Sequence, residues 1–212
     1  MKVKTLIFDL DGTISDPKEG ILKSLNFALE HFSFETIDEQ QVDHFIGPPL
    51  DLTFSSITQS TDQKLIHNLV ARYRERYADI GYAENNLYDG ITETLQGLHK
   101  NKQYRIGLCT SKRVDFAEQI LTMFGLQELF SFLNGGEIGV HKWQQLKQLR
   151  EDEIIDANSI MIGDRDVDLI AAHKNQLPSA AVLWGYGSMT ELKKENPDYI
   201  FEQPQQLVEL MV

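Results

Sequence analysis

The chain has 212 residues, of which 42% are hydrophobic and 25% are charged, values that are typical of a globular protein and exclude a disordered or fibrous chain. Its 32 acidic and 20 basic residues give a formal charge of -12, which repels nucleic acid backbones and anionic membranes, so neither is expected as a partner. No apolar run approaches the roughly 18 residues of a membrane span and no secretory leader is recognised, so a cytoplasmic location is expected.

Short apolar runs recur along the chain and are separated by segments with helical spacing. The runs are VKTLIF (3–8), YRIGLC (104–109), NSIMIG (158–163), SAAVLW (179–184) and PDYIF (197–201). This alternation predicts an α/β fold in which a doubly wound, Rossmann-like parallel sheet is covered by helices on both faces. The single cysteine, Cys109, ends the second run and is expected to be a buried core residue.

The interval between Phe8 and Tyr104 breaks this alternation, because it holds helical patterns and no convincing strand. The first helix is expected to begin at Pro17, and the third is expected to end at Gly81. The N-cap residues predicted for these three helices are Asp16, Asp38 and Thr61.

The helical interval predicts an inserted all-helical module. The chain returns to the sheet through a helix that Asp89 is expected to cap. We therefore expect a core formed by residues 1–15 and 86–212, and a helical module formed by residues 16–85.

Two carboxylates, Asp9 and Asp11, follow the first predicted strand in the stretch FDLDGTISD. Side chains two residues apart on a strand point the same way, so the two charges would crowd each other unless a cation or a proton relieves them. The carboxyl end of a parallel strand is where ligands bind in open α/β sheets. On its own, the pair could equally shape a turn with Gly12.

A second acidic group strengthens the functional interpretation. Asp164 follows the predicted strand SIMI, as Asp9 follows the first one, and Asp168 lies four residues further on. If the segment after Asp164 is helical, both carboxylates can face the same place. Carboxylates at two strand ends are a credible Mg²⁺ site, because Mg²⁺ binds a few carboxylates and leaves other positions to water and phosphate.

A third strand end reads LCTSK and supplies the hydroxyl of Thr110 and backbone N–H groups near Ser111 for a phosphate oxygen. Taken alone, Thr110 or Ser111 could also simply cap the following helix. Lys142 is a further candidate, a cation that would neutralise an attacking carboxylate and a phosphoryl group.

These four places resemble the motifs of the haloacid dehalogenase superfamily of phosphatases. The D-x-D-G-T motif matches Asp9 to Thr13, the second-motif threonine matches Thr110, the third-motif lysine matches Lys142, and G-D-x-x-x-D matches Gly163 to Asp168. The insertion resembles the helical C1 cap of the subgroup that contains phosphoglycolate phosphatases. Further stretches resemble a bacterial branch labelled phosphoglycolate phosphatase or 5′-nucleotidase, among them IGPPL, YRERYADIGYAENNLYDGI and WGYGS.

The resemblance implies a role for each matching residue. Asp9 would be the nucleophile and a Mg²⁺ ligand, and Asp11 the acid/base, which ligates the metal through its backbone carbonyl. The phosphoryl group would be held by Gly12, Thr110, Ser111 and Lys142, and the metal site would be completed by Asp164 with Asp168 in support. The superfamily's frequent Thr-Asn is Thr110-Ser111 here, and Trp143 follows Lys142 where proline is often found.

The cap is expected to exclude water and to recognise the rest of the substrate. The resemblance places the Gly47 turn of IGPPL near the cleft, although a plain helix break is an equal alternative. Arg74 could meet a substrate carboxylate or second phosphate, or it could form a solvated face with Arg72 and Arg76.

The leading hypothesis is a Mg²⁺-dependent phosphomonoester hydrolase that acts on a small phosphorylated metabolite through an aspartyl-phosphate, in the manner of a phosphoglycolate phosphatase. The alternatives are a 5′-nucleotidase, a sugar phosphomutase and an inactive phosphate-binding module. Dehalogenation is disfavoured because Asp11 suits a phosphoryl leaving oxygen. A P-loop protein is disfavoured because no G-x-x-x-x-G-K-[ST] motif is present. The protein is expected to be a monomer or a homodimer.

Overall fold

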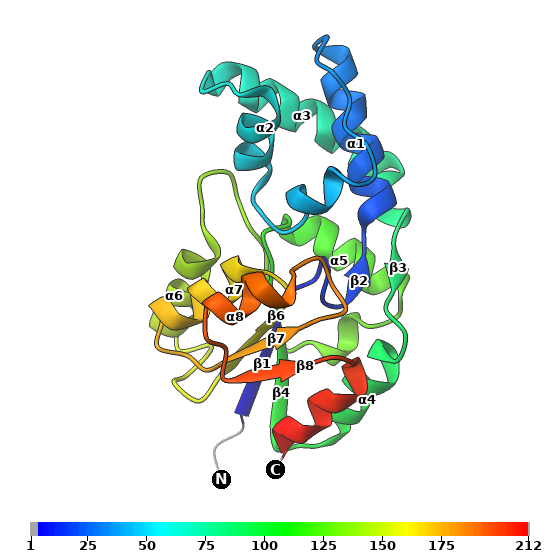
Figure 1. Ribbon diagram of the computed structural model, residues 1–212. Helices are drawn as coiled ribbons and strands as arrows, with labels where there is room; N and C mark the ends of the chain where they lie inside the picture. The colour runs from blue at the N-terminus through cyan, green and yellow to red at the C-terminus, as the bar shows by residue number, and fades with distance from the viewer. Residues whose placement is uncertain (1–3, 212) are drawn as a thin grey trace.

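A parallel six-stranded sheet with the strand order β5-β4-β1-β6-β7-β8 forms the centre of the molecule in the computed structural model, which describes residues 4–211 (Figure 1). The strands are β1 (Lys4–Phe8), β4 (Tyr104–Cys109), β5 (Leu133–Asn134), β6 (Ile160–Gly163), β7 (Ser179–Val182) and β8 (Tyr199–Phe201). Each apolar run identified in the sequence contains one of these strands; Val3, which begins the first run, lies outside the described residues.

Helices cover both faces of the sheet, because successive residues of a buried strand point to opposite sides. On β1, Leu6 and Phe8 join the apolar cluster that includes side chains of α4 (Ile91–Lys100) and α5 (Val114–Met123). Ile7 joins the cluster formed with α6 (Lys142–Glu151) and α7 (Asp166–Lys174). The short helix α8 (Met189–Lys194) packs beside α7, and a 3-10 segment (Pro204–Met211) lies against α4. The α/β, doubly wound prediction is thereby confirmed.

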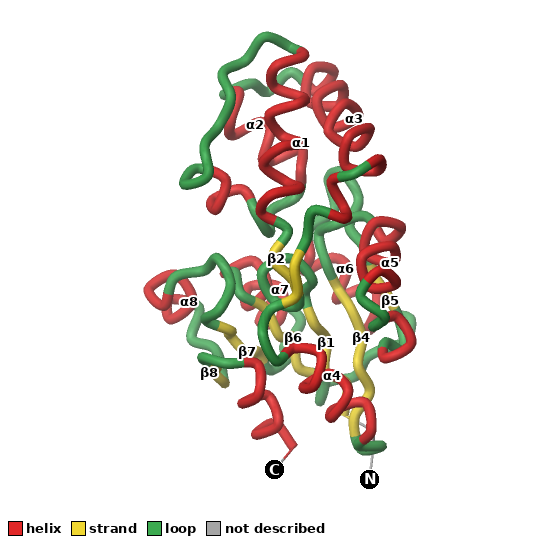
Figure 2. The backbone as a smooth tube through the Cα atoms, turned by 90° about the vertical axis from the view of Figure 1, so that its right-hand side faces the viewer, coloured by secondary structure: helices red, strands yellow, loops and turns green. Residues whose placement is uncertain are grey.

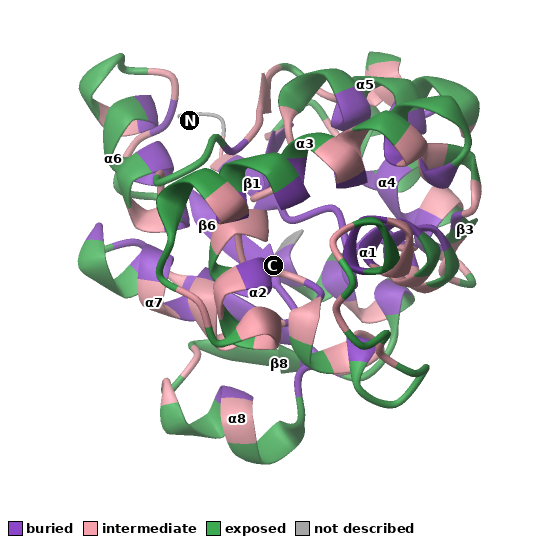
Figure 3. Ribbon diagram, turned by 90° about the horizontal axis from the view of Figure 1, so that it is seen from above, coloured by how far each residue is buried: buried purple, intermediate pink, exposed green. Residues whose placement is uncertain are grey.

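A separate group of helices stands above the carboxyl edge of the sheet (Figures 1 and 2). It consists of α1 (Lys18–His31), α2 (Leu50–Thr58) and α3 (Gln63–Asp79), with short 3-10 turns at Val42–Phe45 and Gly81–Ala83. Its own buried apolar residues include Leu25, Leu29, Phe54, Leu69 and Tyr77. In Figure 3 the exposed residues lie on the outer sides of these helices. No helix within residues 4–211 is both long and apolar enough to cross a membrane.

The helical region is joined to the core through a small two-stranded sheet. Strand β2 (Ser15–Asp16) pairs antiparallel with β3 (Asn86–Leu87), so the chain leaves the core and returns to it at the same place. The expectation of an interval without strands is therefore wrong. Strands of two residues are too short to show the alternating pattern on which that expectation depended.

The helix predicted after Asp38 is also wrong, because the segment forms only the 3-10 turn Val42–Phe45. Asp38 does accept hydrogen bonds from the backbone N–H groups of Gln40 and Gln41. The turn cannot extend, because Gly47 has a φ of 108° and two prolines follow it. Helix α2 begins directly after the prolines and was missed by the sequence analysis.

Three predicted N-caps are shifted by one residue. Helix α3 is capped by Asp62, whose carboxylate accepts hydrogen bonds from two backbone N–H groups, and not by Thr61. Helix α4 is preceded by Gly90, with a φ of 79°, and not by Asp89. Helix α1 has Pro17 at its N-cap position and not Asp16, although the Asp16 carboxylate accepts a hydrogen bond of 2.9 Å from the backbone N–H of Lys18.

Candidate active site

The strand order brings the sequence-predicted residues to one edge of the sheet. Strands β4, β1 and β6 are parallel neighbours, so Thr110, Asp9 and Asp164, which follow their carboxyl ends, lie side by side. The backbone N–H of Asp9 donates to the Ile162 carbonyl at 2.9 Å and thereby holds the start of the Asp9 loop against β6. The parallel sheet therefore gathers motifs that lie far apart in sequence, with Asp9 about a hundred residues before Thr110 and Thr110 about fifty before Asp164.

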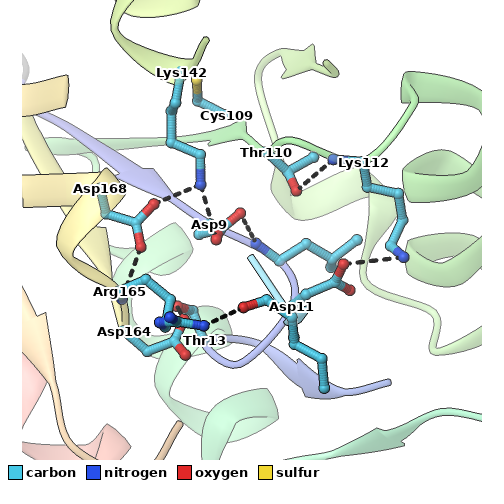
Figure 4. A network of polar contacts seen from close by, with 12 residues as sticks. Asp9, Asp11, Thr13, Cys109, Thr110, Lys112, Lys142, Asp164, Arg165 and Asp168 are labelled. Atoms are coloured by element: carbon cyan, nitrogen blue, oxygen red, sulfur yellow. Dashed lines mark hydrogen bonds and ion pairs between the residues drawn. The ribbon is translucent and has the colours of Figure 1, made fainter. Parts of the chain in front are cut away.

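Three buried carboxylates meet at this edge. One oxygen each of Asp9, Asp164 and Asp168 can be chosen so that all lie within 4.8 Å of one another. Asp168 comes from the first turn of α7, as the sequence predicted. The ammonium of Lys142, at the start of α6, lies 2.8 Å from Asp9 and 2.5 Å from Asp168 (Figure 4). This lysine, whose side chain is 2% exposed, is thus positioned by two carboxylates.

The charges in this cluster do not balance. Asp164 accepts hydrogen bonds only from neutral donors among the described residues, the Thr13 hydroxyl and the Tyr186 backbone N–H. Burial raises the pKa of Asp164, and the nearby Asp168 and Asp9 raise it further. Burial alone would lower the pKa of Lys142, but Asp168 and Asp9 outweigh that effect and raise it. Three carboxylates facing one ammonium fit a divalent cation with oxygen ligands.

Asp11 lies in a different environment from Asp9. Its Oδ2 is 3.0 Å from the Lys112 ammonium, whereas Asp9 pairs with Lys142. Burial raises the pKa of the Asp11 carboxyl, Lys112 opposes that rise and Asp9 adds to it. Strand β1 ends at Phe8, so the two carboxylates are not held on one face of a strand, and each has its own lysine. The carboxylate of Asp11 is not in the cluster of Asp9, Asp164 and Asp168; metal ligation through its backbone carbonyl remains a prediction.

The loop after β4 differs from the sequence expectation in one respect. Helix α5 begins at Val114 with Arg113 as its N-cap, so neither Thr110 nor Ser111 caps it. The Thr110 hydroxyl instead accepts a hydrogen bond of 3.2 Å from the Lys112 backbone N–H, and its carbonyl accepts one from Gln145. Thr110 is 1% exposed and lies beside Asp9 in Figure 4.

Gly12 is required by close packing in this site. A Cβ at Gly12 would lie 2.1 Å from Asp164 Oδ2, and its φ of +83° is in the region that favours glycine. Its N–H donates to the Ser15 carbonyl at 2.8 Å. The absence of a side chain at Gly12 thus allows the Asp164 carboxylate to lie against the backbone of the Asp9 loop. A contact between Gly12 and phosphate stays a prediction.

A cleft of about 680 Å³, including the part open to solvent, separates this edge from the helical region. Its core side includes Asp9, Asp11, Thr110, Ser111 and Lys112. Its cap side includes Phe45, Gly47, Pro48, Tyr73, Arg74 and Tyr77. Gly47 and Arg74, the two residues of the helical region that the sequence analysis proposed near the substrate, therefore lie on the cleft.

The three arginines of α3 have different surroundings. Arg72 pairs with Glu75 and stacks on Phe27, and Arg76 forms a double hydrogen bond with Glu84. For Arg74, no hydrogen bond or ion pair is formed within residues 4–211, and its buried Nε is without a partner. The three arginines therefore do not form one common face: Arg72 and Arg76 pair with carboxylates, and Arg74 lies on the cleft.

Several residues of the site were quoted within motifs but given no role. Lys112 belongs to CTSK and contacts Asp11; Tyr186 belongs to WGYGS and contacts Asp164. Arg165 reaches from the Asp164 loop to the backbone carbonyls of Asp43 and Ile46 in the cap, and Gly47 packs against its side chain. Because these contacts join segments far apart in sequence, no local pattern could have revealed them.

Comparisons with known proteins agree with this geometry. A family model described as haloacid dehalogenase-like hydrolase matches residues 6–182. The chain is 35% identical to a 5′-nucleotidase of Pseudomonas aeruginosa, over 94% of this chain and 91% of that one. It is 27% identical to a phosphoglycolate phosphatase of Aliivibrio fischeri, over 95% and 93% of the two chains. A crystal structure of a predicted phosphatase from Clostridium acetobutylicum superposes with a TM-score of 0.92 at 33% identity, covering 100% of this chain and 99% of that one.

Proposed function

The chain belongs to the haloacid dehalogenase-like hydrolases, as a phosphatase of that family, and from this membership we propose that it is a Mg²⁺-dependent phosphomonoesterase with Asp9 as nucleophile. The observation that carries the proposal is the division between its two motif carboxylates. Asp9 lies in the carboxylate cluster beside Lys142, whereas Asp11 is buried next to Lys112 with a raised pKa. Carboxylates in unlike environments are suited to unlike tasks.

The proposed reaction has two steps. In the first, an Asp9 oxygen attacks phosphorus, the bond from phosphorus to the ester oxygen breaks, and the Asp11 carboxyl gives its proton to that oxygen. In the second, the Asp11 carboxylate takes a proton from water, the water oxygen attacks phosphorus, and the bond to Asp9 breaks. Inorganic phosphate leaves, Asp9 is again a carboxylate and Asp11 is again protonated.

The phosphoryl group needs compensation for its negative charge. Lys142 is held by Asp9 and Asp168 where it can face both the nucleophile and the phosphoryl oxygens, and Thr110 and Ser111 line the cleft next to it. Asp9 and Asp164, with Asp168 in support and the Asp11 carbonyl, would hold Mg²⁺. When bound, the cation supplies charge stabilisation for the phosphoryl group.

We propose that the core comprises residues 1–15 and 86–212 and the cap residues 16–85. The β2–β3 pair lies at the two points where the chain passes between these parts. The cleft side chains from both parts would then close around the substrate and exclude water from the aspartyl-phosphate.

We propose a substrate with a second anionic group, as in phosphoglycolate. The support is Arg74, a half-buried guanidinium on the cleft that has no partner within residues 4–211. Burial and the neighbouring Arg113 lower the pKa of Arg74, and Glu137 and Asp115 oppose them, so a carboxylate ligand would relieve its desolvation. The aromatic residues Phe45 and Tyr73 on the cleft favour the second candidate, a nucleoside monophosphate.

A panel of phosphate esters tests the proposal. We expect Mg²⁺-dependent release of phosphate that EDTA abolishes and added Mg²⁺ restores, with no restoration by Ca²⁺, because the larger ion coordinates more loosely. Phosphoglycolate and nucleoside 5′-monophosphates are then ranked by kcat/KM. Full activity in chelator would contradict the metal assignment. Transfer of phosphate to a sugar phosphate instead of water would indicate a mutase, and the absence of turnover for the whole panel would indicate a binding module.

A further inference from the structure

The Lys112 ammonium joins the cap to the proposed acid/base. It lies 3.0 Å from Asp11 Oδ2, and it donates a hydrogen bond of 2.7 Å to the hydroxyl of Tyr77. The same ammonium is 4.3 Å from the centroid of the Tyr77 ring. Lys112 follows β4 in the core, Asp11 follows β1, and Tyr77 belongs to cap helix α3. Figure 4 shows the Lys112 side chain extending toward Asp11 and away from the Asp9 cluster.

We propose that Lys112 is a positioning residue that orients the Asp11 carboxyl for proton transfer, and that the Tyr77 hydroxyl holds Lys112 in place. The proposal rests on the proposed function, because it assumes that Asp11 exchanges a proton with the ester oxygen and then with water. It gives the cap a part in the chemical step in addition to any contact with the substrate.

Lys112 is the charged group that fixes one side of Asp11. The other carboxylate oxygen, Oδ1, is buried and has no hydrogen-bond partner within residues 4–211. The other lysine of the site, Lys142, is 2.8 Å from Asp9 and is shared with Asp168. Without Lys112, the Asp11 carboxyl would therefore lose its charged partner and with it the contact that fixes the direction of the side chain. General acid catalysis requires the carboxyl within hydrogen-bond reach of the leaving oxygen, so such a loss of direction is costly.

Lys112 is itself held at both ends. Its backbone N–H donates to the Thr110 hydroxyl, and its ammonium is held by Tyr77 and Asp11, with the side chain 6% exposed. A lysine side chain is flexible, so fixing its end requires such contacts. The contact with Thr110 also sets the position of Lys112 relative to the proposed phosphoryl site.

Tyr77 is suited to this task because it cannot easily move. It is fully buried and stacks on Tyr73 with a centroid distance of 5.3 Å and an interplanar angle of 13°. On its other side, Phe116 of core helix α5 contacts it edge-on at 5.2 Å. The hydroxyl of Tyr77 therefore sits at a fixed place where cap and core meet.

The test compares two esters of similar shape. The leaving group of p-nitrophenyl phosphate departs as a stable anion at neutral pH, whereas phenol, with a pKa of about 10 as in tyrosine, depends more on a proton donor. The parameter kcat/KM covers the steps up to departure of the leaving group. We expect Lys112→Met to lower kcat/KM about tenfold to a hundredfold for phenyl phosphate and less than about threefold for p-nitrophenyl phosphate. The loss for phenyl phosphate is smaller than that of removing the acid/base itself, because Asp11 is still present.

Tyr77→Phe provides the second variant, because it keeps the buried ring and removes only the hydroxyl. We expect the same discrimination between esters with a smaller loss, about threefold to tenfold for phenyl phosphate, a fraction of the acid/base contribution. Because Tyr77 acts through Lys112, the double variant should be no slower than Lys112→Met. Tyr104→Phe is the matched control. It removes a tyrosine hydroxyl that donates to the Leu210 carbonyl, at the amino end of β4 and thus opposite the site. It should not change the ratio of kcat/KM for the two esters.

Equal losses for the two esters in Lys112→Met would overturn the proposal, because Lys112 would then bind the phosphate ester or support the fold in general. Additive losses in the double variant would overturn the part assigned to Tyr77. A wild-type protein that hydrolyses neither ester with Mg²⁺ would contradict the proposed function and this inference with it. A wild-type protein that is active, with variants that do not discriminate between the esters, would contradict this inference alone.

Discussion

The two walls of the cleft differ in what they bury. The core wall includes Asp9, whose carboxylate belongs to a cluster of buried charges with Lys142, Asp164 and Asp168. All four residues are at most 4% exposed and are fixed by ion pairs or hydrogen bonds. The cap wall belongs to helices that pack around an apolar and aromatic cluster. Its arginine on the cleft, Arg74, has no partner within residues 4–211. Buried charges need oppositely charged or hydrogen-bonding partners at fixed positions, whereas an unpaired cation on a cleft is free to pair with an anionic ligand. The difference supports the proposal that the core wall carries the chemistry and that the cap wall sets selectivity.

The two walls are nevertheless packed together. Phe116 from core helix α5 is part of the cap's apolar cluster, and Tyr77 contacts both Phe116 and Lys112. Arg165, next to Asp164, reaches the carbonyls of the cap loop. A substitution at one of these contacts, such as Tyr77 or Lys112, should therefore affect the chemical step as well as the packing of the two walls.

The largest effect is expected for Asp9→Asn. An amide oxygen is a poor nucleophile toward phosphorus, so no aspartyl-phosphate should form and turnover should be essentially absent for every ester. In the wild type, borohydride should reduce the trapped aspartyl-phosphate to homoserine, which peptide mass spectrometry can locate at Asp9. Modification at Asp164 or Asp168 instead, or wild-type activity in the variant, would contradict the assignment of the nucleophile.

Asp11→Asn should have the second largest effect. Loss of a positioned general acid/base typically costs about 10²–10⁴-fold in rate. The variant should still fold, and it should form the trapped intermediate with p-nitrophenyl phosphate, whose leaving group needs no proton. Steady-state kinetics with several leaving groups measure this difference. A uniform loss across the leaving groups would argue that Asp11 acts in some other way.

Much of the core wall could be predicted from the sequence because it is made of short, contiguous signals. Each apolar run contains a strand, and parallel strands place their carboxyl ends at one edge, so Asp9, Thr110 and Asp164 were expected to meet. The pairing of Asp11 with Lys112 could not be predicted, since it depends on how two loops turn after their strands. The N-cap of α5 is Arg113 and neither Thr110 nor Ser111 for the same reason.

The cap was predicted less completely. Its helical character follows from the spacing of Leu25, Leu29, Leu69 and Tyr77, which are all buried. Helix α2 was missed, because only Thr53 and Phe54 of its nine residues are buried and a nine-residue helix with so few buried positions shows little periodicity. That Arg74 lacks a partner while Arg72 and Arg76 have one depends on contacts with Phe27 and Glu84, which no pattern in the helix discloses.

Arg74→Met tests the cap wall and should have an intermediate effect. Loss of a charge-assisted hydrogen bond costs about 1.5–3 kcal/mol, or roughly tenfold to a hundredfold in kcat/KM, for a substrate with a second anionic group. Hydrolysis of p-nitrophenyl phosphate, which lacks that group, should change little. The matched control is Arg72→Met on the same helix, which loses a pair with Glu75 and lies outside the cleft. Equal losses for both esters in Arg74→Met would place selectivity elsewhere.

The smallest expected effect concerns the stability cost of the core's buried charge. Because burial and the neighbouring carboxylates raise the pKa of Asp164, the folded protein without metal binds a proton there that the unfolded chain has released above about pH 4. Stability of the metal-free wild type should therefore fall as pH rises from about 4, and Asp164→Asn should remove that contribution. The variant's melting temperature relative to wild type should rise with pH, by about 2–4 °C for each kcal/mol. Differential scanning calorimetry in EDTA measures how the difference between the two melting temperatures changes with pH. That change is independent of pH-independent effects of the new amide, such as its contacts with Thr13 and the Tyr186 N–H. With Mg²⁺ present, the wild type should melt at a higher temperature than the variant, because the cation compensates the carboxylates of the wild type and not those of the variant. A relative melting temperature that does not change with pH in EDTA would show that the carboxylates of the core wall are balanced without a metal.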